Sequence, residues 1–261
     1  GMMEMMSFVG ILLGTILGTM LSELVSIWII CALMLLFTTI SFITVYRLKI
    51  VEIPSEKPIF NTINPIKYMI ESFRFAQKYK GINDAVLGSS IFWMIAGMLQ
   101  LNLVIHCRQT LELSNIGTGL CMSSAAVGIA LGCVFAGKIL RSDNAFRMIN
   151  IGLLAMNIFL SLIIVFNPNV YIFSLLMFGV TFFGGIFEVP CLAIVQRAPI
   201  GRIVGDMMAY LNFANFVLVL IGTAIFYAVS AFSNESSIAI FTSIEVILFL
   251  SLIYFVFKFR K

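Results

Sequence analysis

Long runs of apolar residues, separated by short charged or turn segments, follow one another along most of the chain. An α-helix needs roughly 20 apolar residues to cross the ~30 Å hydrocarbon core of a bilayer, and most of the runs have about that length. The pattern therefore predicts eight transmembrane helices, at residues 7–22, 26–46, 85–106, 116–137, 147–166, 171–193, 206–229 and 237–258.

One long segment, residues 47–84, departs from this pattern. Within it, Asn64 is a suitable N-cap and Pro65 suits the first position of a helix. Apolar residues then recur at spacings of three and four, which predicts an amphipathic helix over residues 65–80. Such a helix lies either on the inner membrane surface or against the protein's own cytoplasmic face, and the pattern leaves both alternatives open.

The composition supports an all-α, polytopic membrane protein. Hydrophobic residues make up 61% of the chain and charged residues only 11%, with a mean hydropathy of +1.09. Soluble domains carry roughly 25% charged residues, so a soluble globular enzyme is excluded. No nucleotide-binding loop, nucleophile motif or metal-ligand spacing occurs in the sequence. We therefore expect no enzyme activity, no cofactor, no metal and no nucleic-acid partner.

The basic residues predict the orientation of the helices. All but one of the 16 Lys and Arg residues fall in alternate loops or in the C-terminal tail, and the exception is Arg108. Basic loops remain in the cytoplasm, so the segments 47–84, 138–147 and 196–205 and the C-terminus are expected there. An even number of spans places the N-terminus on the same side. The expected location is the cytoplasmic (inner) membrane.

The predicted helices fall into unequal groups: two helices (1–46), a linker with the amphipathic helix (47–84) and six helices (85–261). Two six-helix halves joined by a cytoplasmic loop make up the major facilitator fold. On that plan, the chain corresponds to a partial major facilitator fold, with the last two helices of a first half and all of a second half.

Several short motifs carry a more specific resemblance. They are residues 184–199 (GGIFEVPCLAIVQRAP), 201–205 (GRIVG), 212–213 (NF), 64–68 (NPIKY), 92–93 (FW) and 101–103 (LNL). In this order they resemble the lysophospholipid transporters of the major facilitator superfamily. That resemblance implies transport of a lysophospholipid, or another small amphiphile, across the bilayer by alternating access. Such transporters occur either alone or fused to acyltransferase and acyl-ACP synthetase domains. The resemblance therefore also implies an acyltransferase or acyl-ACP synthetase as a partner.

Charged residues inside predicted spans need a functional or structural reason, because each costs about 2.5–3.5 kcal/mol on insertion scales. Glu188 follows Gly184 and Gly185 and precedes Pro190. We interpret these glycines and the proline as a helix break beside a carboxylate that binds a proton or a headgroup amine, or that forms a structural hydrogen bond. Glu245 in the last helix is a second embedded carboxylate, which belongs either to the substrate or proton path or, more simply, to a buried pair.

Polar amides suggest where a substrate or proton path would lie. Gln100 and Asn102 occupy one predicted helix, where a polar line could bind glycerophosphate oxygens or join neighbouring helices. Asn212 and Asn215 are three residues apart and are predicted to share a helix face. Arg197 and Arg202 lie in a cytoplasmic loop, where they could meet anionic headgroups or act only as topology signals.

Two other function classes remain open at this stage. One is a proton-coupled transporter of a drug or small metabolite, with Glu188 as the proton carrier. The other is a non-transporting membrane scaffold or remnant that packs against another membrane protein.

Overall fold

The computed structural model describes residues 25–47, 64–141, 143–200 and 203–258, with a few single positions before residue 25. The predicted helix 7–22 and Arg202 therefore lie largely or wholly outside the described residues. The described elements are α2 (Ile27–Tyr46), α3 (Pro65–Ala76), α4 (Ile82–Ile105), the π-helical turn η1 (His106–Thr110), α5 (Asn115–Ile139), α6 (Ala145–Phe166), α7 (Val170–Gln196), α8 (Val204–Phe232) and α9 (Ser237–Lys258).

The described ranges confirm an all-α, polytopic membrane fold. Seven helices, α2 and α4 to α9, are long and apolar enough to cross a membrane, each within a few residues of its predicted bounds. Among these seven helices, α4 differs most from its predicted bounds, because η1 extends it to Thr110. No strand occurs in the described residues, and the helices are consistent with part of a major facilitator fold.

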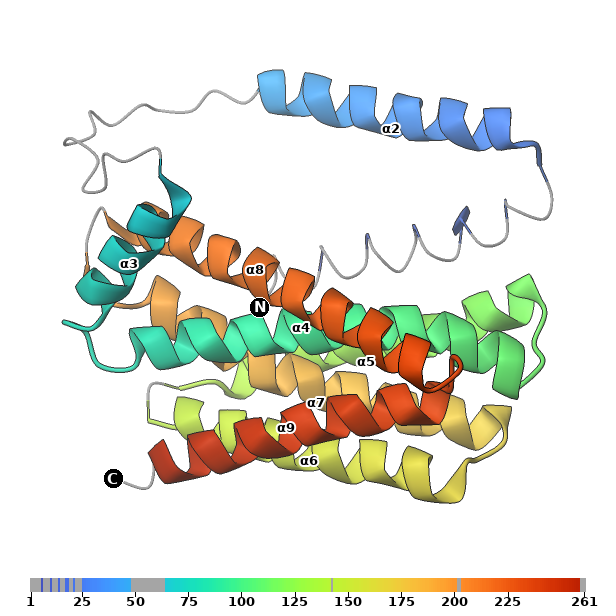
Figure 1. Cartoon of the computed structure of the whole chain (residues 1–261). Helices are drawn as coiled ribbons and strands as arrows, with labels where there is room; N and C mark the ends of the chain where they lie inside the picture. The colour runs from blue at the N-terminus through green and yellow to red at the C-terminus, as the bar shows by residue number, and fades with distance from the viewer. Residues whose placement is uncertain are drawn as a thin grey trace.

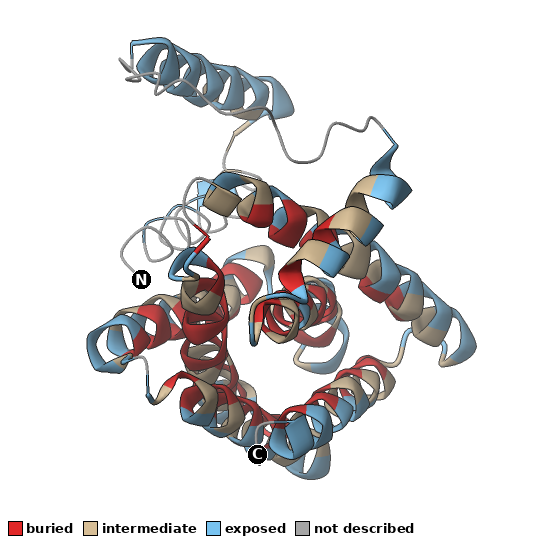
Figure 2. Cartoon of the chain, turned by 90° about the vertical axis from the view of Figure 1, so that its left-hand side faces the viewer, coloured by how far each residue is buried: buried red, intermediate tan, exposed pale blue. Residues whose placement is uncertain are grey.

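Helices α4 to α9 form one bundle, and α2 lies apart from it (Figures 1 and 2). Within the bundle, α7 packs against α5 and α6, while α4 packs against α7, α8 and α9. None of the residues of α2 is buried, whereas the window of α4 and η1 that would cross the membrane is 56% buried. Helix α4 is therefore the structural centre of the described bundle.

The short loops place the ends of the bundle helices alternately on two sides, and almost all basic residues of the described bundle gather on one side. We call this side the basic end; its described basic residues are Lys67, Arg74, Lys78, Lys80, Lys138, Arg141, Arg147, Arg197 and Lys258. Arg108 lies at the opposite end. This arrangement is the one that the alternation in the sequence predicted.

Close approach of α5 and α7 depends on glycines from both helices. A Cβ atom added at Gly185 would lie 2.6 Å from the backbone nitrogen of Cys133, and one at Gly128 would lie 2.6 Å from the carbonyl oxygen of Phe178. These distances are far below ordinary van der Waals contact. Small residues let the two backbones touch, which is how membrane helices gain packing energy without a hydrophobic drive between them.

The helix break predicted at Gly184, Gly185 and Pro190 is wrong. Helix α7 continues without interruption from Val170 to Gln196, with Pro190 inside it. The glycines serve packing instead, because Gly185 contacts the backbone of α5 and Gly184 faces the ring of Phe92. Neighbouring helices support a proline-containing helix in a membrane, so the missing backbone N–H need not end it.

Helix α3 begins at its predicted first residue, ends at Ala76 and not at residue 80, and packs against the protein itself, which is one of the two predicted alternatives. The Asn64 side chain accepts hydrogen bonds from the backbone nitrogens of Ile66 and Lys67, at 3.0 and 3.3 Å. Helix α3 packs against α8 and α4, where the Tyr68 hydroxyl donates to the carbonyl oxygen of Asp206 at 3.0 Å. Its apolar residue Ile70 remains 47% exposed, so the outer face of α3 is still free to contact lipid.

Candidate functional site

Two adjacent serines of α4 hold the buried polar residues of α7 and α8. The Ser89 hydroxyl donates to Oε1 of Glu188 at 2.7 Å, and the Ser90 hydroxyl donates to Oδ1 of Asn215 at 2.8 Å. All four side chains are buried, and Glu188 is only 2% exposed. The structure therefore places Glu188 and Asn215 on two different neighbours of α4, helices α7 and α8. The sequence interpretation identified these two acceptors but missed the donors, for which the pair of serines in an apolar run is the signal.

Asn102 lies on the other side of α4 from Gln100. The Asn102 amide is fully buried and donates to the carbonyl oxygen of Ser237, the first residue of α9, at 2.9 Å. Gln100 is exposed and has no hydrogen-bond partner within the described ranges. The predicted polar line is thus wrong, because residues two apart on an α-helix point in directions about 200° apart.

The only histidine reinforces the contact between α4 and α9. His106 is fully buried, its Nδ1 atom lies 2.8 Å from the Ser237 hydroxyl, and its ring packs between Phe173 and Phe241. Thr110 reaches the same Ser237 hydroxyl at 3.2 Å. The π-helical turn that starts at His106 brings both side chains to one partner. This histidine is therefore a buried residue that joins the end of α4 to the start of α9.

Gln100 borders an apolar cavity of about 140 Å³ between α4, α5 and α7. Most of the cavity wall consists of aliphatic, aromatic and methionine side chains, among them Leu99 and Met122. Thr181 and Trp93 are the other wall residues with a polar group, and the Thr181 hydroxyl already donates to the backbone of α7. The cavity therefore offers an apolar ligand one free amide.

Glu245 pairs with a hydroxyl away from that cavity. Oε1 of Glu245 accepts from the Ser161 hydroxyl at 2.7 Å, which joins α9 to α6. Its second carboxylate oxygen is buried and has no hydrogen-bond partner among the described residues. Glu245 is thus not part of the α4–α5–α7 cavity.

The remaining predicted residues do not join a common site. Asn212 is exposed on α8, although Asn215 is buried, so the two amides do not share a buried face. Arg197 ends α7 and borders a shallow pocket at the basic end together with Arg141. No group of His, Cys, Asp and Glu that could hold a metal ion occurs in the described part of the chain.

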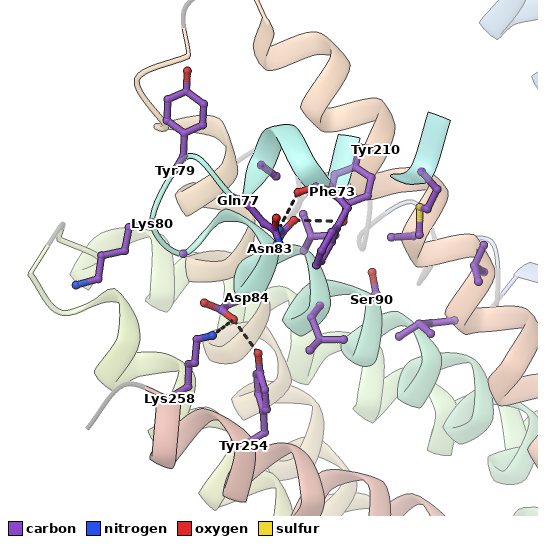
Figure 3. Close-up of a pocket in the computed structure, with 18 residues that line it drawn as sticks. Phe73, Gln77, Tyr79, Lys80, Asn83, Asp84, Ser90, Tyr210, Tyr254 and Lys258 are labelled. Atoms are coloured by element: carbon purple, nitrogen blue, oxygen red, sulfur yellow. Dashed lines mark hydrogen bonds and ion pairs between the residues drawn. The ribbon is translucent and has the colours of Figure 1, made fainter. Parts of the chain in front are cut away.

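A larger cavity of about 520 Å³ lies at the basic end, between α3, α4, α8 and α9 (Figure 3). Asp84 of α4 accepts a hydrogen bond from the Tyr254 hydroxyl at 2.8 Å and lies 3.4 Å from the Nζ atom of Lys258. The sequence does not reveal this cavity, because its residues come from the ends of four helices and form no local motif.

The comparisons with known proteins agree with this architecture. A family model described as Major Facilitator Superfamily matches residues 1–223. No curated protein matches the chain. The match covers most of the sequence and includes α2 to α7 and most of α8, and the described helices supply the apolar spans that this family requires. The chain belongs to the major facilitator superfamily and is a multi-pass membrane transporter of that type.

Proposed function

We propose that this protein moves lysophospholipid across the cytoplasmic membrane, from the outer side to the inner side. The observation that carries the proposal is the apolar cavity between α4, α5 and α7, with the exposed Gln100 amide at its wall. Sugars and ions need several polar or charged partners, which this wall lacks. A single acyl chain needs apolar walls and few hydrogen bonds.

Alternating access requires the cavity to change size during transport. At about 140 Å³ it holds part of an acyl chain, and the exposed Gln100 amide can donate to a glycerol or phosphate oxygen near the chain. The close α5–α7 contact lets these two helices move as a pair beside α4. In this proposal the protein is a transporter and not an enzyme. Its lipid is then re-acylated by a separate acyltransferase or acyl-ACP synthetase, and its termini lie in the cytoplasm.

Uptake by proteoliposomes tests the proposal. Purified protein is reconstituted, and the uptake of labelled lysophosphatidylethanolamine is measured with unlabelled lysolipid, a lipophilic cationic drug or a sugar as competitor. We expect uptake that only lysolipids block and that Gln100→Leu reduces. Asn212→Leu is the matched control, because Asn212 is an exposed amide outside the cavity. Folded protein without any uptake would contradict the proposal and favour a non-transporting scaffold.

A second candidate function, proton-coupled transport of a drug or small metabolite, is favoured by the burial of Glu188 at 2% exposure. Glu188→Gln retains an acceptor for Ser89 but cannot bind and release a proton. If the protein is proton-coupled, this variant loses the pH dependence of uptake and the drug competes with substrate. If it carries lysolipid without a proton, the variant and the wild type share one pH profile.

A further inference from the structure

The cavity at the basic end is already formed and has the size of a small-molecule site. Its volume of about 520 Å³ lies within the range of about 300–1,000 Å³ that is usual for ligand pockets. Two hydrogen bonds hold the wall that α3, α4 and α8 form. Asn83 Nδ2 donates to the carbonyl oxygen of Phe73 at 3.1 Å, and the Tyr210 hydroxyl donates to Asn83 Oδ1 at 3.3 Å. These bonds join α3, α4 and α8, so the cavity does not depend on a ligand to form.

The charged side chains of this cavity give it one net positive charge. Asp84 and Lys258 form an ion pair, and the Tyr254 hydroxyl fixes the same carboxylate. Lys80 also lines the cavity, is exposed and forms no ion pair among the described residues. Figure 3 shows Asp84 beside Lys258, and Lys80 on the same side of the view with its ammonium group directed outward. The exposed Lys80 side chain has the rotational freedom to turn toward the cavity. Two ammonium groups and one carboxylate suit a ligand with a single negative charge.

Apolar side chains continue from the cavity to the outside of the bundle. Phe73 of α3 and Leu87 of α4 both line the cavity and remain 44% and 37% exposed. Ile66 and Ile70 extend this exposed apolar surface along α3. A ligand held here can therefore keep an anionic group beside the lysines and an acyl chain against the apolar surface.

We propose that this cavity binds the glycerophosphodiester headgroup of a membrane lipid, with its phosphate at Lys80 and Lys258. A phosphodiester carries one negative charge, which balances the net charge of the cavity. Lysine binds phosphate as a point charge, and Asp84 holds Lys258 at the cavity. This site is separate from the α4–α5–α7 cavity and needs no transport. The lipid is either a lysophospholipid or a two-chain phospholipid of the adjacent leaflet, since both have the same headgroup chemistry.

Lipid binding to the full chain tests the proposal directly. Native mass spectrometry measures the adducts formed with lysophosphatidylethanolamine, with dioleoylphosphatidylethanolamine and with monooleoylglycerol, which lacks phosphate. We expect Lys80→Gln and Lys258→Gln each to weaken binding of at least one phosphate lipid about fivefold, because a lysine near a membrane surface contributes about that factor. Binding of monooleoylglycerol should not change. Lys138→Gln is the matched control, since Lys138 is an exposed lysine at the same end outside the cavity.

The two lipid sources give different results, and both support the site. If the cavity variants weaken the binding of lysophosphatidylethanolamine alone, the cavity is a lysolipid site. If they weaken the binding of the two-chain lipid, the cavity is a site for a leaflet phospholipid. The proposal is overturned if both cavity variants bind the phosphate lipids as the wild type does, or if Lys138→Gln weakens binding equally. Lys80 has an exposed side chain without an ion pair in the described ranges, so its variant should fold. The readout is binding, so a failure of lysolipid transport would leave this result unchanged.

Discussion

The crossing of α5 and α7 makes a quantitative prediction about Gly185. In Gly185→Ala the new Cβ atom would lie 2.6 Å from the backbone nitrogen of Cys133, 2.8 Å from the carbonyl carbon of Gly132 and 2.9 Å from the carbonyl oxygen of Ile129. All three atoms belong to the backbone of α5 and cannot rotate away. To restore ordinary contact, the two helices must separate by roughly 0.5–1 Å, which forfeits a quarter to a half of each affected dispersion contact.

The expected cost follows from two opposing effects. Overpacking a close contact costs about 1–3 kcal/mol, and alanine is favoured over glycine inside a helix by up to about 1 kcal/mol in water. We expect Gly185→Ala to lower the free energy of unfolding by about 1–2 kcal/mol. Gly97→Ala is the matched control, because its Cβ atom would meet only Val219 Cγ1, at 3.9 Å. That variant should be neutral or slightly more stable.

Reversible unfolding by SDS in mixed micelles, followed by far-UV circular dichroism, gives both free energies. The two glycines lie inside transmembrane helices, so the difference between the variants isolates the close crossing from the general effect of a methyl group. Equal unfolding free energies for Gly185→Ala and Gly97→Ala would refute the argument that the α5–α7 backbones touch at this position.

Three further substitutions test contacts made by α3 and α4. Asn102→Leu removes the hydrogen bond to the first residue of α9, and the same SDS titration should show a loss of about 0.6–1.7 kcal/mol. Ser90→Ala removes the donor to the α8 amide and should lower the free energy of unfolding by about 0.6 kcal/mol. If either variant unfolds with the same free energy as the wild type, the hydrogen bond assigned to that residue is contradicted. Tyr68→Phe should raise deuterium uptake in α3, because the bond from its hydroxyl to α8 is lost. Burial raises the pKa of Tyr68 above its usual value of about 10, so in the wild type this contact should persist at lower pH and weaken as pH rises through the raised pKa. The difference in absorbance at 295 nm between wild type and Tyr68→Phe measures that pKa, and a midpoint at or below 10 would contradict the buried contact.

The sequence was sufficient to locate the transmembrane helices that the structure describes, because hydropathy and helix length are local properties. The bounds of α9 agree at both ends, and the Asn64 cap was visible in two residues. The alternation of basic loops also predicted which helix ends lie together. None of these inferences requires knowledge of what each helix contacts.

The rotation of each helix about its axis could not be predicted. Apolar residues surround the transmembrane helices on all sides, so no polar stripe shows which face is buried. Gln100 and Asn102 consequently seemed to form one polar line, although only Asn102 faces α9. In the same way, Gly184 and Gly185 suggested flexibility, because the sequence does not show that the backbone of α5 lies against them.

The contacts between α4 and α9 have a mechanical consequence. A rod that is pinned at one point can pivot, but a rod pinned at two distant points cannot. Helix α4 is joined to α9 by Asp84 and Lys258 at the basic end and by Asn102 and Ser237 at the opposite end. The two helices are thus held together at both ends of the bundle. A conformational change that moves α7 relative to this pair must therefore break the buried Ser89–Glu188 hydrogen bond, whereas α4 and α9 can move together without losing either of their own contacts.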